Sequence, residues 1–458
     1  MTGLFAPQAL LPAGWASDVL LEIGDDGEIA SLAVGAERGG AESAAGPVLP
    51  GMPNLHSHAF QRAMAGAAET RGSQGDSFWT WREAMYALVR ELTPERMHAI
   101  AALLYLELLR GGFTSVAEFH YVHRAPDASL YDDPAEVSVH VVEAAQRAGI
   151  GITHLPVLYA RGGFGGEPLA PAQGRFASDA GGVLRIVEEL RARYAGDSEV
   201  RIGLAPHSLR AVAPEVLREV IRELHAADAE APVHIHVAEQ TREVDECLAA
   251  TGARPVQWLL DHADVDRCWC LVHATHMNDE EIERLARSRA VAGLCPTSEA
   301  NLGDGLFPLP SYLAADGRFG VGTDSQVSRD AAEELRWLEY GQRLSERRRN
   351  IAASPDTPSV GGRLWRAALA GGARALARPV GELAAGRRAD LIVLDGNHVD
   401  LAGRSGDALL DGLIFSGASG LVRDVMVGGR WRVRDGRHHD QDAIEADYRE
   451  AIRALQAG

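Results

Sequence analysis

The sequence contains no lysine, so arginine provides all 45 of its lysine-plus-arginine side chains. This absence excludes several kinds of chemistry, because a Schiff base, a P-loop phosphate site and a carboxylated lysine between two metal ions all require a lysine. Any anion that the protein holds by positive charge must therefore be bound by arginine. The planar guanidinium group can donate two parallel hydrogen bonds to one carboxylate.

Long apolar runs and a disulfide framework are also missing. No stretch of about 18 apolar residues occurs, so no membrane-spanning helix is expected. The first residues lack the basic start of a signal peptide, and Asp18 and Glu22 interrupt their apolar stretch. Four cysteines in 458 residues are too few for a disulfide scaffold. We therefore expect a cytoplasmic protein, in which Cys268 and Cys270 either pack inside a strand or form a soft metal pair.

The charge balance limits the partners that the protein can bind. The formal net charge is −19, and neither a basic stripe nor a recognised nucleic-acid-binding motif is present, so a nucleic-acid partner is not expected. The same negative field repels an anionic substrate. Such a substrate would need arginines placed at its own binding site.

Two kinds of sequence pattern divide the chain. Residues 1–48 read as short strands with Gly-Asp turns, and the same pattern returns from residue 378. Between them, short apolar runs alternate with helical stretches, which is typical of parallel sheets built from βα units. The expected parallel strands are PNLHSH, FTSVAEF, GITHLPVLY, VRIGLAPHS, PVHIHVAE, CWCLVHAT, AVAGLCPTS and FGVGTDS.

This order predicts an α/β fold with a (β/α)₈ TIM-like barrel over residues 49–377. Residues 1–48 and 378–440 are expected to pair into a small β-sandwich against the barrel, and residues 441–458 have the periodicity of a C-terminal helix. An open doubly wound sheet is the alternative fold. It is disfavoured because no glycine-rich phosphate loop follows the first strand.

Histidines and carboxylates gather at the carboxyl ends of the expected strands, where barrel enzymes place their chemistry. The first strand ends in an HxH pair, whose alternation on a strand sends both side chains to one face. Nitrogen and carboxylate ligands of this kind suit Zn²⁺ or Fe²⁺. The candidates are His56, His58, His234, His236, Glu239, His273, His276 and Asp324.

The pieces PGMPNLHSH, HVAE, VHATH, GTDS and GELAAGRRADLIVLD resemble the amidohydrolase superfamily, and the resemblance covers nearly the whole chain. It implies the mononuclear deaminase branch of that superfamily. One divalent metal ion, Zn²⁺ or Fe²⁺, would then be bound by His56, His58, His236 and Asp324. The HxxE motif selects His236 as the ligand and leaves His234 in the core. The resemblance also places His273 beside the attacking water, with His276 as a weaker alternative.

Within that branch, the stretches NLHSHAFQRAMAG, WTWREAMY, EFHYVH and APHSLRAV are most similar to the N-formimino-L-glutamate deiminases, enzymes of histidine breakdown. Their small anionic substrate carries two carboxylates and a cationic amidine-like group. Arginines in loops after the first and fourth strands, and polar side chains near them, are placed to bind such a substrate. The expected substrate-binding residues are Gln61, Arg82, Tyr121, His207 and Arg210.

The expected reaction is hydrolysis of the formimino group to give N-formyl-L-glutamate and ammonia. Asp324 accepts a proton from the metal-bound water, His273 stabilises the oxygen, and Glu239 carries protons as general acid and base. A deaminase of a nucleobase or other cyclic amidine would share the metal site, as would a hydrolase of an amide or C–Cl bond. A metal-binding regulatory protein on a dead barrel would have lost Glu239, His273 and Asp324. Relatives are commonly dimeric, so a homodimer is expected, with Arg82 serving its own or a partner's site.

Overall fold

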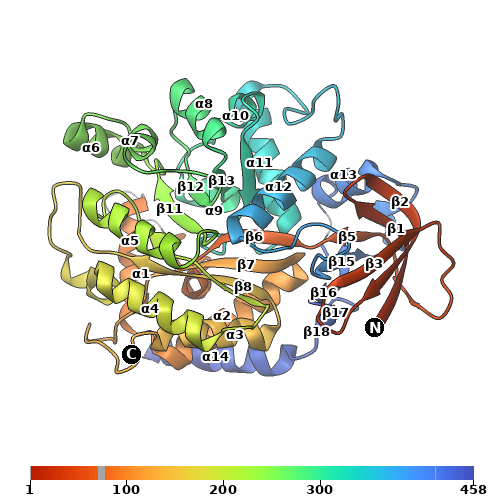
Figure 1. The fold of residues 1–458 in the computed structure, drawn as a ribbon, viewed down its shortest axis with the longest axis horizontal. Helices are drawn as coiled ribbons and strands as arrows, with labels where there is room; N and C mark the ends of the chain where they lie inside the picture. Colours follow the sequence, from red (N-terminus) through yellow and green to blue (C-terminus); the bar gives the residue numbers. More distant parts are fainter. Residues whose placement is uncertain (1, 71–77, 418, 458) are drawn as a thin grey trace.

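The protein is described by a computed structural model that covers residues 2–70, 78–417 and 419–457. Segments from the two ends of the chain lie side by side in it, at one side of the molecule (Figure 1). Strand β5 joins them, because Leu49 pairs antiparallel with Ile392 of β15. Their nine-stranded sheet has the order β18-β17-β16-β15-β5-β1-β2-β3, with β4 beside β1. Its strands are β1 Thr2–Leu11, β2 Gly14–Ile23, β3 Ile29–Val34, β4 Glu42–Ser43, β5 Val48–Pro50, β15 Leu391–Leu394, β16 Val422–Val427, β17 Arg430–Arg434 and β18 Arg437–His438.

This sheet has a hydrophobic core of its own, separate from the larger core of the chain. Alternate residues of β1 and β2 point into it, and apolar residues of β15 and β16 complete it from the other end of the chain. Its buried members are Leu4, Ala6, Ala9, Val19, Leu21, Ile23, Ile29, Ala44, Val48, Leu383, Ala389, Leu391, Val393 and Met426.

Two parallel sheets occupy the middle of the chain. One has the order β6-β7-β8-β10 with β9 beside β8, and the other has the order β11-β12-β13-β14. Isolated parallel bridges join the sheets at both edges, from Ser57 to Asp324 and from Leu204 to Val233. Their strands are β6 Met52–Ser57, β7 Phe113–His120, β8 Gly151–Leu158, β9 Val200–Ile202, β10 Ala205–Pro206, β11 Val233–Val237, β12 Trp269–His273, β13 Val291–Leu294 and β14 Arg318–Val321.

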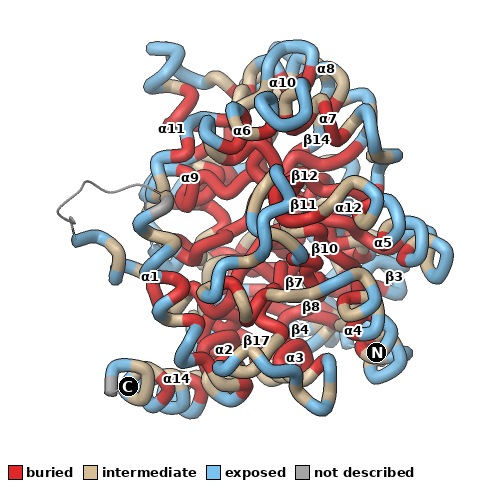
Figure 2. Tube along the Cα trace, turned by 90° about the vertical axis from the view of Figure 1, so that its left-hand side faces the viewer, coloured by how far each residue is buried: buried red, intermediate tan, exposed pale blue. Residues whose placement is uncertain are grey.

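Each of the eight strand segments predicted from the sequence overlaps an observed strand, with one difference. The segment VRIGLAPHS forms two short strands, β9 and β10, which are separated at Gly203 and Leu204. A side chain at Gly203 would collide with the Pro232 carbonyl, so this close approach of two chain segments requires glycine. Every residue of β7 and β8 is buried, as expected for strands covered on both faces (Figure 2).

Helices connect and cover the parallel strands. The predicted helix after residue 93 is α2, in which Pro94 occupies the first turn and the Thr93 hydroxyl accepts a hydrogen bond from the Arg96 amide at 3.3 Å. The C-terminal helix is α14. The helices are α1 Phe78–Arg90, α2 Pro94–Arg110, α3 Glu136–Ala148, α4 Ala180–Arg193, α5 Pro214–Ala227, α6 Thr241–Thr251, α7 Pro255–His262, α8 Asp279–Ser288, α9 Pro296–Leu302, α10 Leu309–Ala314, α11 Ala331–Glu346, α12 Val360–Leu376, α13 Asp407–Phe415 and α14 Gln441–Ala457, with 3₁₀ turns η1 Ala59–Met64, η2 Pro171–Phe176 and η3 Val399–Leu401. Within the described ranges, none of these helices has the length and apolar character needed to cross a membrane.

Helix α12 approaches the parallel strands closely through glycine. A Cβ at Gly371 would overlap the Phe319 carbonyl of β14, so Gly371→Ala is expected to lower the free energy of unfolding by about 1–3 kcal/mol. The loss would be measured by chemical denaturation. It would occur although alanine is the better helix former by about 1 kcal/mol. The exposed Ala370→Ser is the control, and equal stabilities for Gly371→Ala and wild type would show that the backbone yields at this contact.

Candidate active site

The four predicted metal ligands come together at the carboxyl ends of the parallel strands. His56 lies in β6, His58 follows it, His236 lies in β11, and Asp324 follows β14. One ligand atom from each lies within 4.8 Å of the others. The Nε2 atoms of His56 and His58 are each 3.3 Å from Oδ1 of Asp324, and the Nε2 atoms of His56 and His236 are 3.1 Å apart. All four side chains are buried.

Backbone carbonyls orient two of these imidazoles. Nδ1 of His58 donates to the Phe119 carbonyl at 2.9 Å, and Nδ1 of His236 donates to the His207 carbonyl at 3.0 Å. This arrangement leaves Nε2 of both rings with its lone pair directed into the cluster, where His58 lies against Asp324 and His236 against His56, as in metal-ligating histidines. Burial lowers the pKa of His58 and His236, and it lowers the pKa of His56 to about 3, so the rings are neutral.

Asp324 completes the cluster as a carboxylate. Burial alone would raise its pKa, but the hydrogen bond and charge of His56 lower the pKa below the ordinary range. The backbone of Asp324 has a φ of 45°, in the left-handed region that non-glycine residues rarely adopt. Three neutral imidazole nitrogens and one carboxylate oxygen fit a divalent transition metal such as Zn²⁺ or Fe²⁺.

A carboxylate and an imidazole lie beside the cluster. Oε1 of Glu239 is 3.8 Å from Nε2 of His273, whose Nδ1 is 3.3 Å from Oε1 of Glu299. Burial raises the pKa of Glu239 to about 7. Burial would lower the pKa of His273, but the charges of Glu239 and Glu299 outweigh it and raise this pKa. Glu239 can therefore exchange a proton near neutral pH, while His273 keeps a proton to donate.

A cavity of about 60 Å³ adjoins the cluster and contains all five predicted substrate-binding residues. Nε2 of Gln61 donates to the Tyr121 hydroxyl at 2.9 Å. Within the described part of the chain, Oε1 of Gln61 is buried without a hydrogen-bond partner, so it can accept a hydrogen bond from a ligand. Aromatic rings form much of the remaining wall. They belong to Phe78, Trp81, Tyr86, Tyr159 and Phe176.

Two arginines line this cavity. Arg210 is only 8% exposed, and burial opposes its charge, but Glu243 and other nearby groups raise its pKa. The guanidinium of Arg82 lies 5.6 Å from the centre of the Tyr86 ring. The prediction that Arg82 lies in a loop was wrong, because it belongs to helix α1. The apolar residues of FWTWREAMYALVR recur at helical spacing, which favours a helix there.

The other candidates lie outside the cluster. His234 is fully buried, and its Nε2 donates to the Ala375 carbonyl at 2.8 Å, as expected of a core residue. Nε2 of His276 donates to the Asp304 carbonyl at 2.8 Å. Of His273 and His276, His273 at the end of β12 is the one that lines the cavity. Cys268 and Cys270 are both buried free thiols.

A sequence model described as "Amidohydrolase family" matches residues 48–432. The chain belongs to the amidohydrolase family. A second model, "Formimidoylglutamate deiminase HutF, N-terminal domain", matches residues 1–45. This amidohydrolase is 55% identical to the formimidoylglutamate deiminase of Pseudomonas aeruginosa over 444 residues, which are 96% of this chain and 97% of that protein.

Two further similarities concern most or all of the chain. The 8-oxoguanine deaminase of Pseudomonas aeruginosa is 34% identical over 418 residues, which are 90% of this chain and 88% of that protein. A crystal structure described as an amidohydrolase from Brucella melitensis is 45% identical, covers 100% of both chains and superposes with a TM-score of 0.94. The parallel α/β core of this amidohydrolase therefore agrees with a solved structure over its full length.

Several buried residues that support the amidohydrolase site were not predicted from the sequence. Glu118 of β7 accepts hydrogen bonds from the Ser57 hydroxyl and the Ala59 amide, both at 2.7 Å, and so fixes the turn that carries His58. Burial raises the pKa of Glu118 to about 7. Glu299 similarly binds His273. A lone glutamate in a strand or a short helix carries no local motif, so only tertiary structure reveals these partners.

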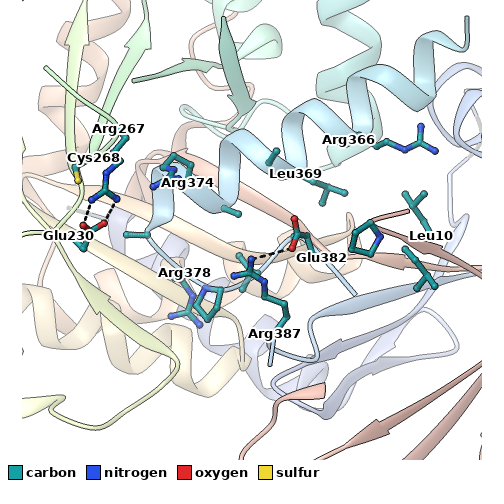
Figure 3. Close-up of a pocket in the computed structure, with 18 residues that line it drawn as sticks. Leu10, Glu230, Arg267, Cys268, Arg366, Leu369, Arg374, Arg378, Glu382 and Arg387 are labelled. Atoms are coloured by element: carbon teal, nitrogen blue, oxygen red, sulfur yellow. Dashed lines mark hydrogen bonds and ion pairs between the residues drawn. The ribbon is translucent and has the colours of Figure 1, made fainter. Parts of the chain in front are cut away.

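A larger cavity of about 550 Å³ lies at the opposite, amino-terminal ends of β11 and β12, against the turn after β1 (Figure 3). It contains none of the predicted site residues. Ion pairs occupy several of its arginines, as Arg267 pairs with Glu230 and Arg387 pairs with Glu382. Active sites on parallel βα folds lie at the carboxyl ends of the strands, so the smaller cavity is the candidate active site.

Proposed function

We propose that this amidohydrolase hydrolyses N-formimino-L-glutamate to N-formyl-L-glutamate and ammonia, a step of histidine degradation. The observation that carries the proposal is the joining, in one cavity, of a His/Asp metal cluster, the Glu239–His273 pair and two arginines. The similarity to a formimidoylglutamate deiminase over 96% of the chain supports the same conclusion.

The cavity suits the charges of this substrate. Arg82 and Arg210 are placed to bind its two carboxylates, and a dianion requires such local donors because the whole protein has a net charge of −19. Tyr121 and His207 complete the carboxylate-binding wall. The buried Oε1 of Gln61 accepts a hydrogen bond from the formimino nitrogen.

His56, His58, His236 and Asp324 would hold one divalent metal ion, Zn²⁺ on our proposal, with Fe²⁺ as the alternative. Bound there, the metal supplies a Lewis acid and lowers the pKa of a coordinated water toward 7. Metal analysis of protein purified without added metal would decide between the two ions.

The chain's own residues move the protons. Asp324 accepts a proton from the attacking water, and protonated His273 donates a hydrogen bond to the oxygen as negative charge develops there. Glu239, as a carboxylate, takes up the proton that remains on this oxygen after the attack and delivers it to the departing nitrogen, so that the C=O bond forms as the C–N bond breaks. The buried position of both groups keeps competing bulk water away from this transfer.

We also propose the finer architecture. The two parallel sheets close into a (β/α)₈ barrel of residues 49–377, supported by the bridges at both edges. Residues 1–48 and 378–440 form a small β-sandwich around their separate core, and the last unit, residues 441–458, contains helix α14 Gln441–Ala457. We expect a homodimer that acts in the cytoplasm, and sedimentation and cell fractionation would test these two expectations.

A nucleobase deaminase is the second candidate, because aromatic rings line the cavity and an 8-oxoguanine deaminase is 34% identical. Ammonia release from N-formimino-L-glutamate, N-formimino-L-aspartate, guanine, 8-oxoguanine and cytosine separates the candidates. We expect rapid release from the first compound alone. Release from a nucleobase alone would reject the carboxylate pocket, and release from none of the five by metal-loaded protein would reject both candidates.

A further inference from the structure

A second cluster of metal-ligating side chains lies on the outer helices, separate from the candidate active site. His98 belongs to α2, and His140 and Glu143 belong to α3. One ligand atom from each lies within 4.8 Å of the others. Both histidines are half-buried and Glu143 is exposed, so the cluster is open to ions from solvent.

A hydrogen bond across the two helices orients the first ligand. Nδ1 of His98 donates to the backbone carbonyl of His140 at 3.1 Å, which leaves Nε2 as the lone-pair atom. His58 and His236 in the active-site cluster are oriented by carbonyls in the same way. Burial lowers the pKa of His98, so its ring is neutral at physiological pH. A neutral, carbonyl-oriented imidazole is the form that binds metal.

The charges around the cluster favour a cation. Oε1 of Glu136 lies 3.5 Å from Nε2 of His140, one helical turn away. Arg147, whose charge acts on His98, is engaged by Asp440 and Asp447 at 3.0 and 2.6 Å. Two carboxylates, Glu136 and Glu143, therefore lie by the histidines, and the one arginine named here is paired with aspartates.

We propose that His98, His140 and Glu143 bind a second divalent transition-metal ion, Zn²⁺ by its preference for imidazole and carboxylate ligands. The ion cross-links α2 to α3 and leaves a coordination position for water. It binds more weakly than the metal of the active site, because three partly exposed residues supply the ligands in place of four buried ones. This inference does not depend on the identity of the substrate.

The test is equilibrium dialysis of the active, metal-loaded enzyme against zinc chloride at micromolar free Zn²⁺, followed by elemental analysis. We expect two metal ions per wild-type chain and one per chain in His98→Gln, with unchanged kcat. Glu143→Gln alters an exposed side chain and leaves both histidines in place, and it is expected to lower the occupancy of the second site because a carboxylate ligand is lost. His398→Gln, which removes a half-buried histidine on another part of the chain, is expected to retain two.

Thermal denaturation gives an independent measurement. Zinc at about 100 times the dissociation constant of the second site stabilises the folded state enough to raise Tm of the metal-loaded wild type by several degrees. His98→Gln is expected to lose this increase, and His398→Gln to keep it. One ion per wild-type chain, or a second ion that persists in both His98→Gln and Glu143→Gln, would overturn the proposal and assign any extra zinc to another site.

Discussion

Glu239→Gln is expected to lower kcat for N-formimino-L-glutamate by about 10²- to 10⁴-fold, because a positioned general acid and base contributes that much to proton transfer. Glutamine keeps the size and hydrogen-bonding capacity of Glu239 but cannot take up a proton and pass it to the departing nitrogen. The metal ligands are not changed, so the metal content per chain should equal that of the wild type. Steady-state ammonia release and elemental analysis on the same preparation measure both quantities.

The pH profile of kcat/KM for the same variant tests whether Glu239 is the group that carries the proton. Because burial raises the pKa of Glu239 to about 7, the wild-type kcat/KM should fall as the pH drops below 7 and the carboxylate becomes protonated. This acidic limb should be absent from the residual activity of Glu239→Gln. Glu283→Gln, which removes an exposed carboxylate on α8, is the control and should leave the profile unchanged. A Glu239→Gln enzyme with substantial activity and the wild-type acidic limb would assign proton transfer to another group.

The parallel strands could be predicted from the sequence because a strand buried on both faces is a continuous run of apolar residues. A strand such as FTSVAEF is an apolar run between turn residues, and all of β7 is buried. The candidate metal ligands could be located for a related reason. His56, His58 and Asp324 end their strands, and parallel strands bring their carboxyl ends to one edge.

The support of the site could not be predicted, because its interactions join residues far apart in sequence without a repeated pattern. Glu118 binds Ser57 from 61 residues away, and Glu299 binds His273 from the next βα unit. The cluster of His98 and His140 depends on the rotation of two neighbouring helices. Local periodicity shows which face of each helix is buried, but it does not show which polar residues meet across the pair.

Arg210→Met is expected to reduce kcat/KM for N-formimino-L-glutamate by about 10²- to 10³-fold. Methionine keeps the apolar stem of the buried side chain but removes the donors that we assign to a substrate carboxylate. Truncating one partner of a buried charge pair costs about 2–5 kcal/mol, since the other charge is left desolvated and unpaired. Because Arg210 interacts with the buried Glu243, circular dichroism and metal content are measured on the same preparation to show that Arg210→Met is folded. Arg218→Met, on the exposed face of α5, is the matched control and should leave kcat/KM unchanged.

A substrate analogue distinguishes carboxylate binding from a structural role of Arg210. N-formimino-4-aminobutyrate lacks the α-carboxylate but keeps the formimino group and the γ-carboxylate. If Arg210 binds the α-carboxylate, wild type and Arg210→Met should process this analogue at similar kcat/KM, and the large difference should appear with the full substrate only. If Arg210 binds the γ-carboxylate, the variant should be impaired on both compounds and Arg82→Met should show the selective pattern instead. Equal impairment of both arginine variants on both compounds, with normal metal content, would contradict the assignment of one carboxylate to each arginine.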